Sequence, residues 1–108
     1  MRRTVFHEVR HIAEMLFPEF DEADKLEDGV LYVVDGSQHD QIVQYNCPCG
    51  CGKPVMIPYY RSGQQKELYP SWGFRERDGK VTLSPSIFST GFPCRSHYFI
   101  RDNRIDWC

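Results

Sequence analysis

Short apolar stretches separated by turn-forming residues run through most of the chain. The clearest is residues 30–34, which are apolar throughout and lie between turn signals at residues 28–29 and 35–37, so they indicate a buried strand. Other short strands are expected at residues 41–46, 55–57, 71–75, 80–83, 97–100 and 104–107, with the proline at position 58 ending the third strand. The pattern therefore predicts a mainly β domain of short antiparallel strands.

The N-terminal part is the one segment where apolar residues follow a helical spacing. Within residues 4–17 they recur at Val5, Val9, Ile12 and Leu16, which favours a short amphipathic helix. Residues 4–6 are β-branched or aromatic and could equally begin a strand. A short N-terminal helix is therefore the one expected addition to the β domain.

His7, Glu8 and His11 match the H-E-x-x-H motif of zinc proteases. This motif functions only on a helix that turns both histidines into a protected cleft. In the expected helix the apolar residues gather on one side, which leaves His7 and His11 on roughly the opposite, solvent side. A third protein ligand is not evident either. We interpret the two histidines as surface residues.

The length and net charge of the chain limit its domain organisation and its possible binding partners. The chain has 108 residues, which indicates a single domain over residues 1–108. A net charge of −2 gives no electrostatic basis for binding nucleic acid or an anionic membrane. No apolar run approaches the roughly 20 residues of a membrane span, and no signal-peptide core is evident, so a cytoplasmic location with reduced thiols is expected.

Three of the five cysteines, Cys47, Cys49 and Cys51, lie within six residues, and Cys94 follows about forty residues later. An odd cysteine count in a reducing compartment favours a metal site over disulfides, and zinc is the expected ion. Two ligand sets are compatible with the spacing: these four cysteines as a closed structural site, or His97 in place of Cys47. The first set is preferred because it leaves His97 free. The terminal Cys108 is interpreted as a spare thiol.

Ser84 and Ser86 flank a proline and, taken alone, indicate only a strand end or a turn. His97 changes this interpretation because it lies three residues after Cys94, so a metal bound there would fix the backbone beside an imidazole. A serine hydroxyl becomes a nucleophile when a nearby histidine accepts its proton. The sequence thus predicts a serine–histidine pair.

Asp106 is the candidate third member of this site. A two-residue turn at residues 102–103 would place Asp106 opposite residue 99 and diagonal to His97 on one face of the hairpin, where its carboxylate could orient the imidazole. The alternative for Asp106 is a salt bridge to Arg101 or Arg104.

Several motifs together resemble domain-of-unknown-function family 6527: LEDGVLY at 26–32, CPCGCG at 47–52, LSPSI at 83–87, CRSHYFI at 94–100 and the closing residues 105–107. The resemblance covers nearly the whole chain. It implies a component of a bacterial ubiquitin-like conjugation operon, with a ubiquitin-like protein and its conjugates and E1-like and E2-like proteins as partners. The implied activity is that of a deubiquitinase-like peptidase, which trims the ubiquitin-like precursor or releases it from targets.

Carried onto this chain, the resemblance implies Cys47, Cys49, Cys51 and Cys94 as metal ligands and Ser84 or Ser86 with His97 for serine-type chemistry. Ser86 is preferred because it follows the proline and is expected at a sharp bend. The walls of a groove for the C-terminal tail of the ubiquitin-like protein could be formed by aromatic side chains, with Trp72, Phe74, Tyr98 and Trp107 as candidates.

Two other functions remain open from the sequence. One is a zinc-dependent hydrolase in which His97 is a ligand, a metal-bound water attacks, and Glu67 or Glu76 is the base. The other is a non-catalytic zinc-knuckle adaptor that binds a ubiquitin-like or E2-like partner.

Overall fold

A computed structural model describes residues 2–16, 26–35, 41–64, 71–89, 91 and 93–108. The regular elements in these residues are all strands: β1 (Glu8–Ile12), β2 (Val30–Asp35), β3 (Gln41–Asn46), β4 (Pro54–Arg61), β5 (Trp72–Arg77), β6 (Lys80–Phe88), β7 (His97–Arg101) and β8 (Arg104–Trp107). The mainly β fold expected from the sequence is confirmed. No helix in the described ranges could cross a membrane.

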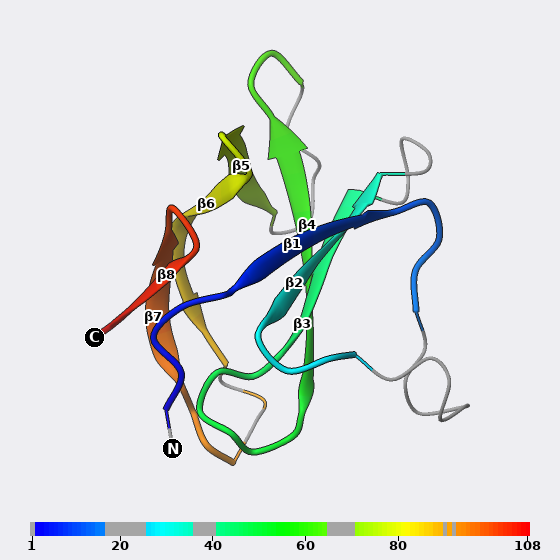
Figure 1. The fold of residues 1–108 in the computed structure, drawn as a ribbon. Coiled ribbons are helices and arrows are strands. Elements are labelled where there is room, and N and C mark those ends of the chain that lie inside the picture. The colour runs from blue at the N-terminus through cyan, green and yellow to red at the C-terminus, as the bar shows by residue number, and fades with distance from the viewer. Residues whose placement is uncertain (1, 17–25, 36–40, 65–70, 90, 92) are drawn as a thin grey trace.

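The strands form one sheet in which each strand pairs with the next along the chain (Figure 1). Most pairs are antiparallel, as predicted, but β1 pairs with β2 and β4 with β5 in parallel. The sheet curls until its two ends meet. There Val5 forms an antiparallel bridge with Arg104, and the Phe6 N–H donates to the Asn103 carbonyl at 2.8 Å. The segment before β1 therefore joins the first strands to β8.

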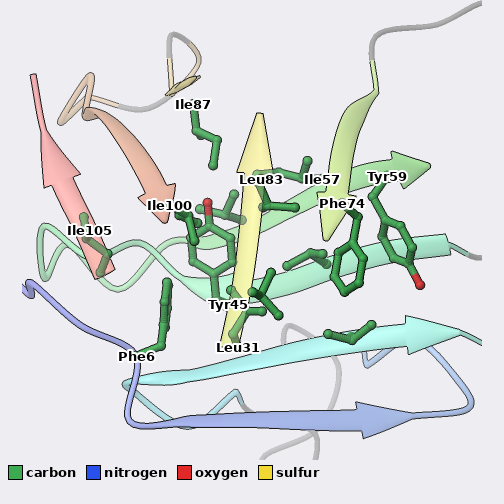
Figure 2. Close-up of a cluster of buried hydrophobic side chains, with 14 of the residues drawn as sticks. Phe6, Leu31, Tyr45, Ile57, Tyr59, Phe74, Leu83, Ile87, Ile100 and Ile105 are labelled. Carbon is green, nitrogen blue, oxygen red and sulfur yellow. The ribbon is translucent and has the colours of Figure 1, made fainter. Parts of the chain in front are cut away.

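The main core lies inside this curled sheet and receives side chains from both halves of it (Figure 2). Phe6 is 2% exposed and packs edge-on against Tyr45, with 5.2 Å between the ring centroids. The Tyr45 and Tyr98 hydroxyls lie 2.7 Å apart and hydrogen bond to each other. This pairing lets two polar groups be buried without leaving either unsatisfied.

The prediction of an N-terminal helix is wrong, because residues 8–12 form strand β1 instead. Val9 packs against the main core, whereas Ile12 packs against a second cluster formed by Leu26, Val30 and Tyr32. Residues three apart point to opposite faces of a strand. Because β1 has apolar neighbours on both faces, its sequence imitates the spacing of an amphipathic helix.

Strand β4 also continues through Pro58, where the sequence predicted its end. The Cys47 N–H donates to the Lys53 carbonyl at 2.8 Å, which sets the hydrogen-bonding alternation between β3 and β4. In that alternation, Pro54 and Pro58 occupy positions whose N–H would point away from β3. The missing N–H groups therefore cost the sheet no hydrogen bond.

Candidate functional site

The four cysteines predicted as ligands converge between the β3–β4 connection and the start of β7. All four Sγ atoms of Cys47, Cys49, Cys51 and Cys94 lie within 4.8 Å of one another. Individual Sγ–Sγ distances are 3.5 Å for Cys47–Cys49, 3.8 Å for Cys47–Cys94 and 3.9 Å for Cys51–Cys94. Four sulfurs around one tetrahedral zinc ion would lie about 3.8 Å apart. This donor set could hold a metal ion.

Main-chain amides support the same cluster in a regular pattern. The N–H groups of Cys49, Lys53 and Ser96 each lie two residues beyond a cysteine and donate to its sulfur. Burial raises the pKa of Cys47 and Cys51, and the amides of Cys49 and Lys53 oppose that increase, whereas the Ser96 amide adds to the lowering of the pKa of Cys94. Amides directed at sulfur stabilise thiolates, the form in which cysteine binds metals. Tight turns make this possible, and Gly50 and Gly52 supply them with φ angles of 92° and 81°.

The surroundings of the individual thiols differ. Burial raises the pKa of Cys47 to about 12. The Ser96 hydroxyl lies 3.2 Å from the Cys94 sulfur, to which it donates, and this contact lowers the pKa of Cys94 to about 6. Ser96 is itself buried, at 6% exposure. Because Ser96 directly precedes His97, this hydrogen bond ties the backbone beside the imidazole to Cys94.

Ser86 and His97 meet on the outer face of neighbouring strands. Ser86 Oγ lies 3.0 Å from His97 Nε2, and both side chains are half-buried. The register between β6 and β7 shifts between Leu83 and Ile87, so that three residues of β6 face one residue of β7. This irregularity contains Ser86 and displaces it from an ideal ladder position. Strand β6 consequently runs on to Phe88, beyond the predicted end at residue 83.

The imidazole and the nucleophile candidate are each held by a further contact. The Phe88 ring stacks on the His97 ring, with 4.8 Å between centroids and 11° between planes. The Trp72 indole N–H donates to the Ser86 carbonyl at 3.2 Å. The Cys108 N–H donates to the His97 carbonyl at 3.0 Å. These contacts fix the backbone of both residues and one face of the ring.

The other two predicted catalytic positions lie elsewhere. Ser84 is exposed and faces Gly73 of β5, with no hydrogen bond to His97 within the described residues. Asp106 pairs with Phe99 and lies diagonal to His97, which is the register expected from the sequence. Its carboxylate, however, accepts a hydrogen bond from Arg101 at 3.3 Å, which is the salt-bridge alternative.

The H-E-x-x-H residues do not converge on a site. Glu8 pairs with Arg10 at 2.7 Å, and His11 contacts Glu76 at 3.0 Å. His7 and His11 are exposed, as expected for surface histidines. Because residues 8–12 form a strand, the helical geometry that the motif requires is absent from this part of the described chain.

Residues 18–108 match the model of a protein family described as Bacterial ubiquitination-like system serine protease (BubE). The chain belongs to this family. It is accordingly a serine-type peptidase, and the resemblance to a bacterial ubiquitin-like conjugation peptidase is confirmed. No curated protein and no solved structure matches the sequence significantly.

Two contacts of this BubE-family chain were not predicted from the sequence, namely Phe88 on His97 and Ser96 on Cys94. The sequence spacing could have predicted both contacts. Phe88 lies two residues after Ser86 and so on the same face of the strand, and Ser96 lies between Cys94 and His97. Of the aromatic residues expected as walls, Phe74 and Tyr98 are buried in the core and Trp107 packs against Tyr98. Trp72 alone of these contacts Ser86.

Proposed function

We propose that this chain is a deubiquitinase-like peptidase that trims the C-terminus of a ubiquitin-like protein or removes that protein from its targets. Ser86 is the nucleophile and His97 the base. The observation that carries the proposal is the 3.0 Å hydrogen bond between Ser86 Oγ and His97 Nε2, in a chain of a serine protease family. The family's ubiquitination-like system supports a ubiquitin-like partner. The proposal also includes E1-like and E2-like proteins as partners and a cytoplasmic location.

The reaction begins with neutral His97, protonated on Nδ1. Its Nε2 accepts the hydroxyl proton while Ser86 Oγ bonds to the scissile carbonyl carbon. The bond to the leaving amine then breaks, and the amine departs with the proton from Nε2, leaving an acyl group on Ser86. Water attacks this ester with His97 again accepting its proton, and Ser86 recovers that proton as the acid product leaves. The stack on Phe88 holds the ring plane during these transfers.

We further propose that the four cysteines hold Zn²⁺ as a structural site. The four thiolates would occupy all four ligand positions of the ion, which would then supply structural cross-linking rather than a reacting group. The link from the β3–β4 connection to Cys94 fixes the backbone three residues before His97. Asp106 is assigned to the ion pair with Arg101, and the base acts without a carboxylate partner among the described side chains.

Neither alternative function has comparable support. A metal-bound water requires an open coordination position and His97 as a ligand, whereas four cysteines already converge and His97 Nε2 faces Ser86. Of the candidate bases for that reaction, Glu76 contacts His11 and Glu67 lies outside the described residues. A purely adaptor role does not account for membership in a serine protease family.

The test is incubation of the purified chain with the precursor of the ubiquitin-like protein from the same system. Intact-mass analysis should show loss of a defined C-terminal fragment. Ser86→Ala should lower the cleavage rate by at least about a thousandfold, since the nucleophile is lost. A fluorophosphonate probe, which acylates activated serines, should modify Ser86.

Ser84→Ala is the matched control because Ser84 is two residues away, exposed and without contact to His97. It should cleave the precursor at a rate close to that of the unaltered chain. Zinc content, measured on all three proteins, should stay the same. Loss of cleavage with Ser84→Ala and retention with Ser86→Ala would reverse the assignment of the nucleophile.

A further inference from the structure

Beside Ser86, the sheet has a gap between β4 and β6, because β5 separates these strands over only part of their length. Strand β5 begins at Trp72, which pairs with Tyr59, so β5 covers only the last part of β4. On its other side, β5 pairs with β6 no further than Ser84. Within the described residues, no strand lies between Pro54–Pro58 of β4 and Ser86–Phe88 of β6. A groove of about 360 Å³ lies between these two segments.

Both sides of this groove present backbone groups that have no strand partner among the residues that the structure describes. The alternation set by Cys47 and Lys53 directs the N–H and carbonyl of Met56 away from β3 and into the groove. On the opposite side, the Ser89 N–H donates to the Ser96 carbonyl at 2.8 Å, which directs the N–H and carbonyl of Phe88 away from β7. Strand partners are about 4.8 Å apart, so one extended chain between β4 and β6 could hydrogen bond to both.

The side chains around the groove also suit an extended peptide. Its floor consists of Val55, Ile57 and Ile87, which are buried. Its rim carries Met56 and Phe88, which are 51% and 47% exposed and are two of the three large apolar side chains exposed in the described residues. A strand presents its side chains alternately to the two faces, so an inserted peptide would direct every second side chain to the floor.

We propose that this groove binds the C-terminal tail of the substrate as an added β-strand between β4 and β6. The proposal rests on the proposed function and names how the same site holds its substrate. The groove is continuous with the site because Trp72 closes one end of it and donates to the Ser86 carbonyl, while Phe88 on the rim stacks on His97. A tail with small or apolar residues at alternate positions fits the floor, and its main chain supplies the hydrogen bonds.

The decisive measurement uses Ser86→Ala protein and a fluorescein-labelled decapeptide with the sequence of the substrate's C-terminal tail. Affinity is read by fluorescence polarisation for a set of peptides, each N-methylated at one amide. In a strand added between β4 and β6, N–H groups bond alternately to the two neighbours, so methylation of any amide within the groove should weaken binding by about tenfold, whereas methylation at the peptide end outside the groove should have little effect. Losses that are no larger for amides within the groove than for the end outside it, or no losses at all, would overturn the proposal. This measurement needs no further change in the protein.

Met56→Pro tests the same groove from the protein side, because the Met56 N–H faces the groove and its removal leaves the β3–β4 ladder intact. Met56→Leu is the reference, since it alters the side chain but keeps the N–H. We expect the proline variant to bind the peptide about tenfold more weakly than the leucine variant. In chains that retain Ser86, the ratio of peptide cleavage to fluorophosphonate labelling should fall likewise. Equal affinities would count against strand addition.

The experiments test the catalytic assignment and the peptide-binding groove independently of each other. If fluorophosphonate does not label Ser86 and no precursor is cleaved, the catalytic assignment is wrong, while peptide binding in Ser86→Ala protein still reports on the groove. If native mass spectrometry finds a dimer that Met56→Pro dissociates, the groove holds a second copy of the chain and the proposal is overturned.

Discussion

Tyr45 and Tyr98 bring two hydroxyl groups into the core, where each is fully buried and satisfied by the other across 2.7 Å. Tyr98→Phe removes one of the pair and leaves the Tyr45 hydroxyl buried without it. We expect a loss of about 1–3 kcal/mol in the free energy of unfolding, measured by urea denaturation, because the buried Tyr45 hydroxyl loses its hydrogen-bond partner.

The double variant Tyr45→Phe/Tyr98→Phe is the informative control. It removes both hydroxyls together, so its loss should be smaller than the sum of the two single losses. Strict additivity would show that the two hydroxyls do not stabilise each other.

The candidate site could be predicted from the sequence wherever local spacing decides geometry. Cysteines separated by one residue around glycines, and a histidine three residues after Cys94, have few ways to be arranged around a metal. The partner of Asp106 could not be predicted in this way. His97 and Arg101 lie on the same face at equal distances along β7, and only side-chain packing selects Arg101.

The segment from Cys94 to the start of β7 is the element whose order depends most on the proposed zinc. Chelation, or Cys94→Ser, should lower the melting temperature by about 10 °C or more and slow fluorophosphonate labelling of Ser86, since the backbone before His97 loses its anchor. Calorimetry, metal analysis and labelling rates measure these effects.

Cys108→Ser provides the matched thiol control, because Cys108 is exposed and lies outside the cluster. It should keep the metal content and the melting temperature of the unaltered chain. If Cys94→Ser loses no metal, the ligand set is wrong.

The strands themselves were predictable where one face is buried and the other exposed, as in β7 and β8. Prediction failed at β1 because a strand between two apolar clusters has apolar residues at odd as well as even separations, and Val9 and Ile12 are three apart. It failed at Pro58 because a proline breaks a strand only when its missing N–H faces a partner, and that direction depends on the pairing with β3.

The closed form of the sheet depends on a segment outside the family match, which begins at residue 18. Phe6 belongs to that segment and fills the core beside Tyr45. Phe6→Ala should therefore cost about 3–5 kcal/mol in the free energy of unfolding, measured by chemical denaturation.

Val5→Ala is the control for that substitution, since the neighbouring Val5 side chain is 46% exposed. Its loss should stay below about 1 kcal/mol. Similar losses at positions 5 and 6 would mean that the start of the chain does not pack into the core as described.

The two prolines of β4 have a consequence for solubility. They leave the outward edge of Pro54–Pro58 with carbonyls at three positions and an N–H at Met56 alone. If two such edges approached each other, acceptors would largely face acceptors, so fibre-like stacking of folded molecules is disfavoured. An extended chain that presents free N–H groups can instead donate hydrogen bonds to the carbonyls of this edge.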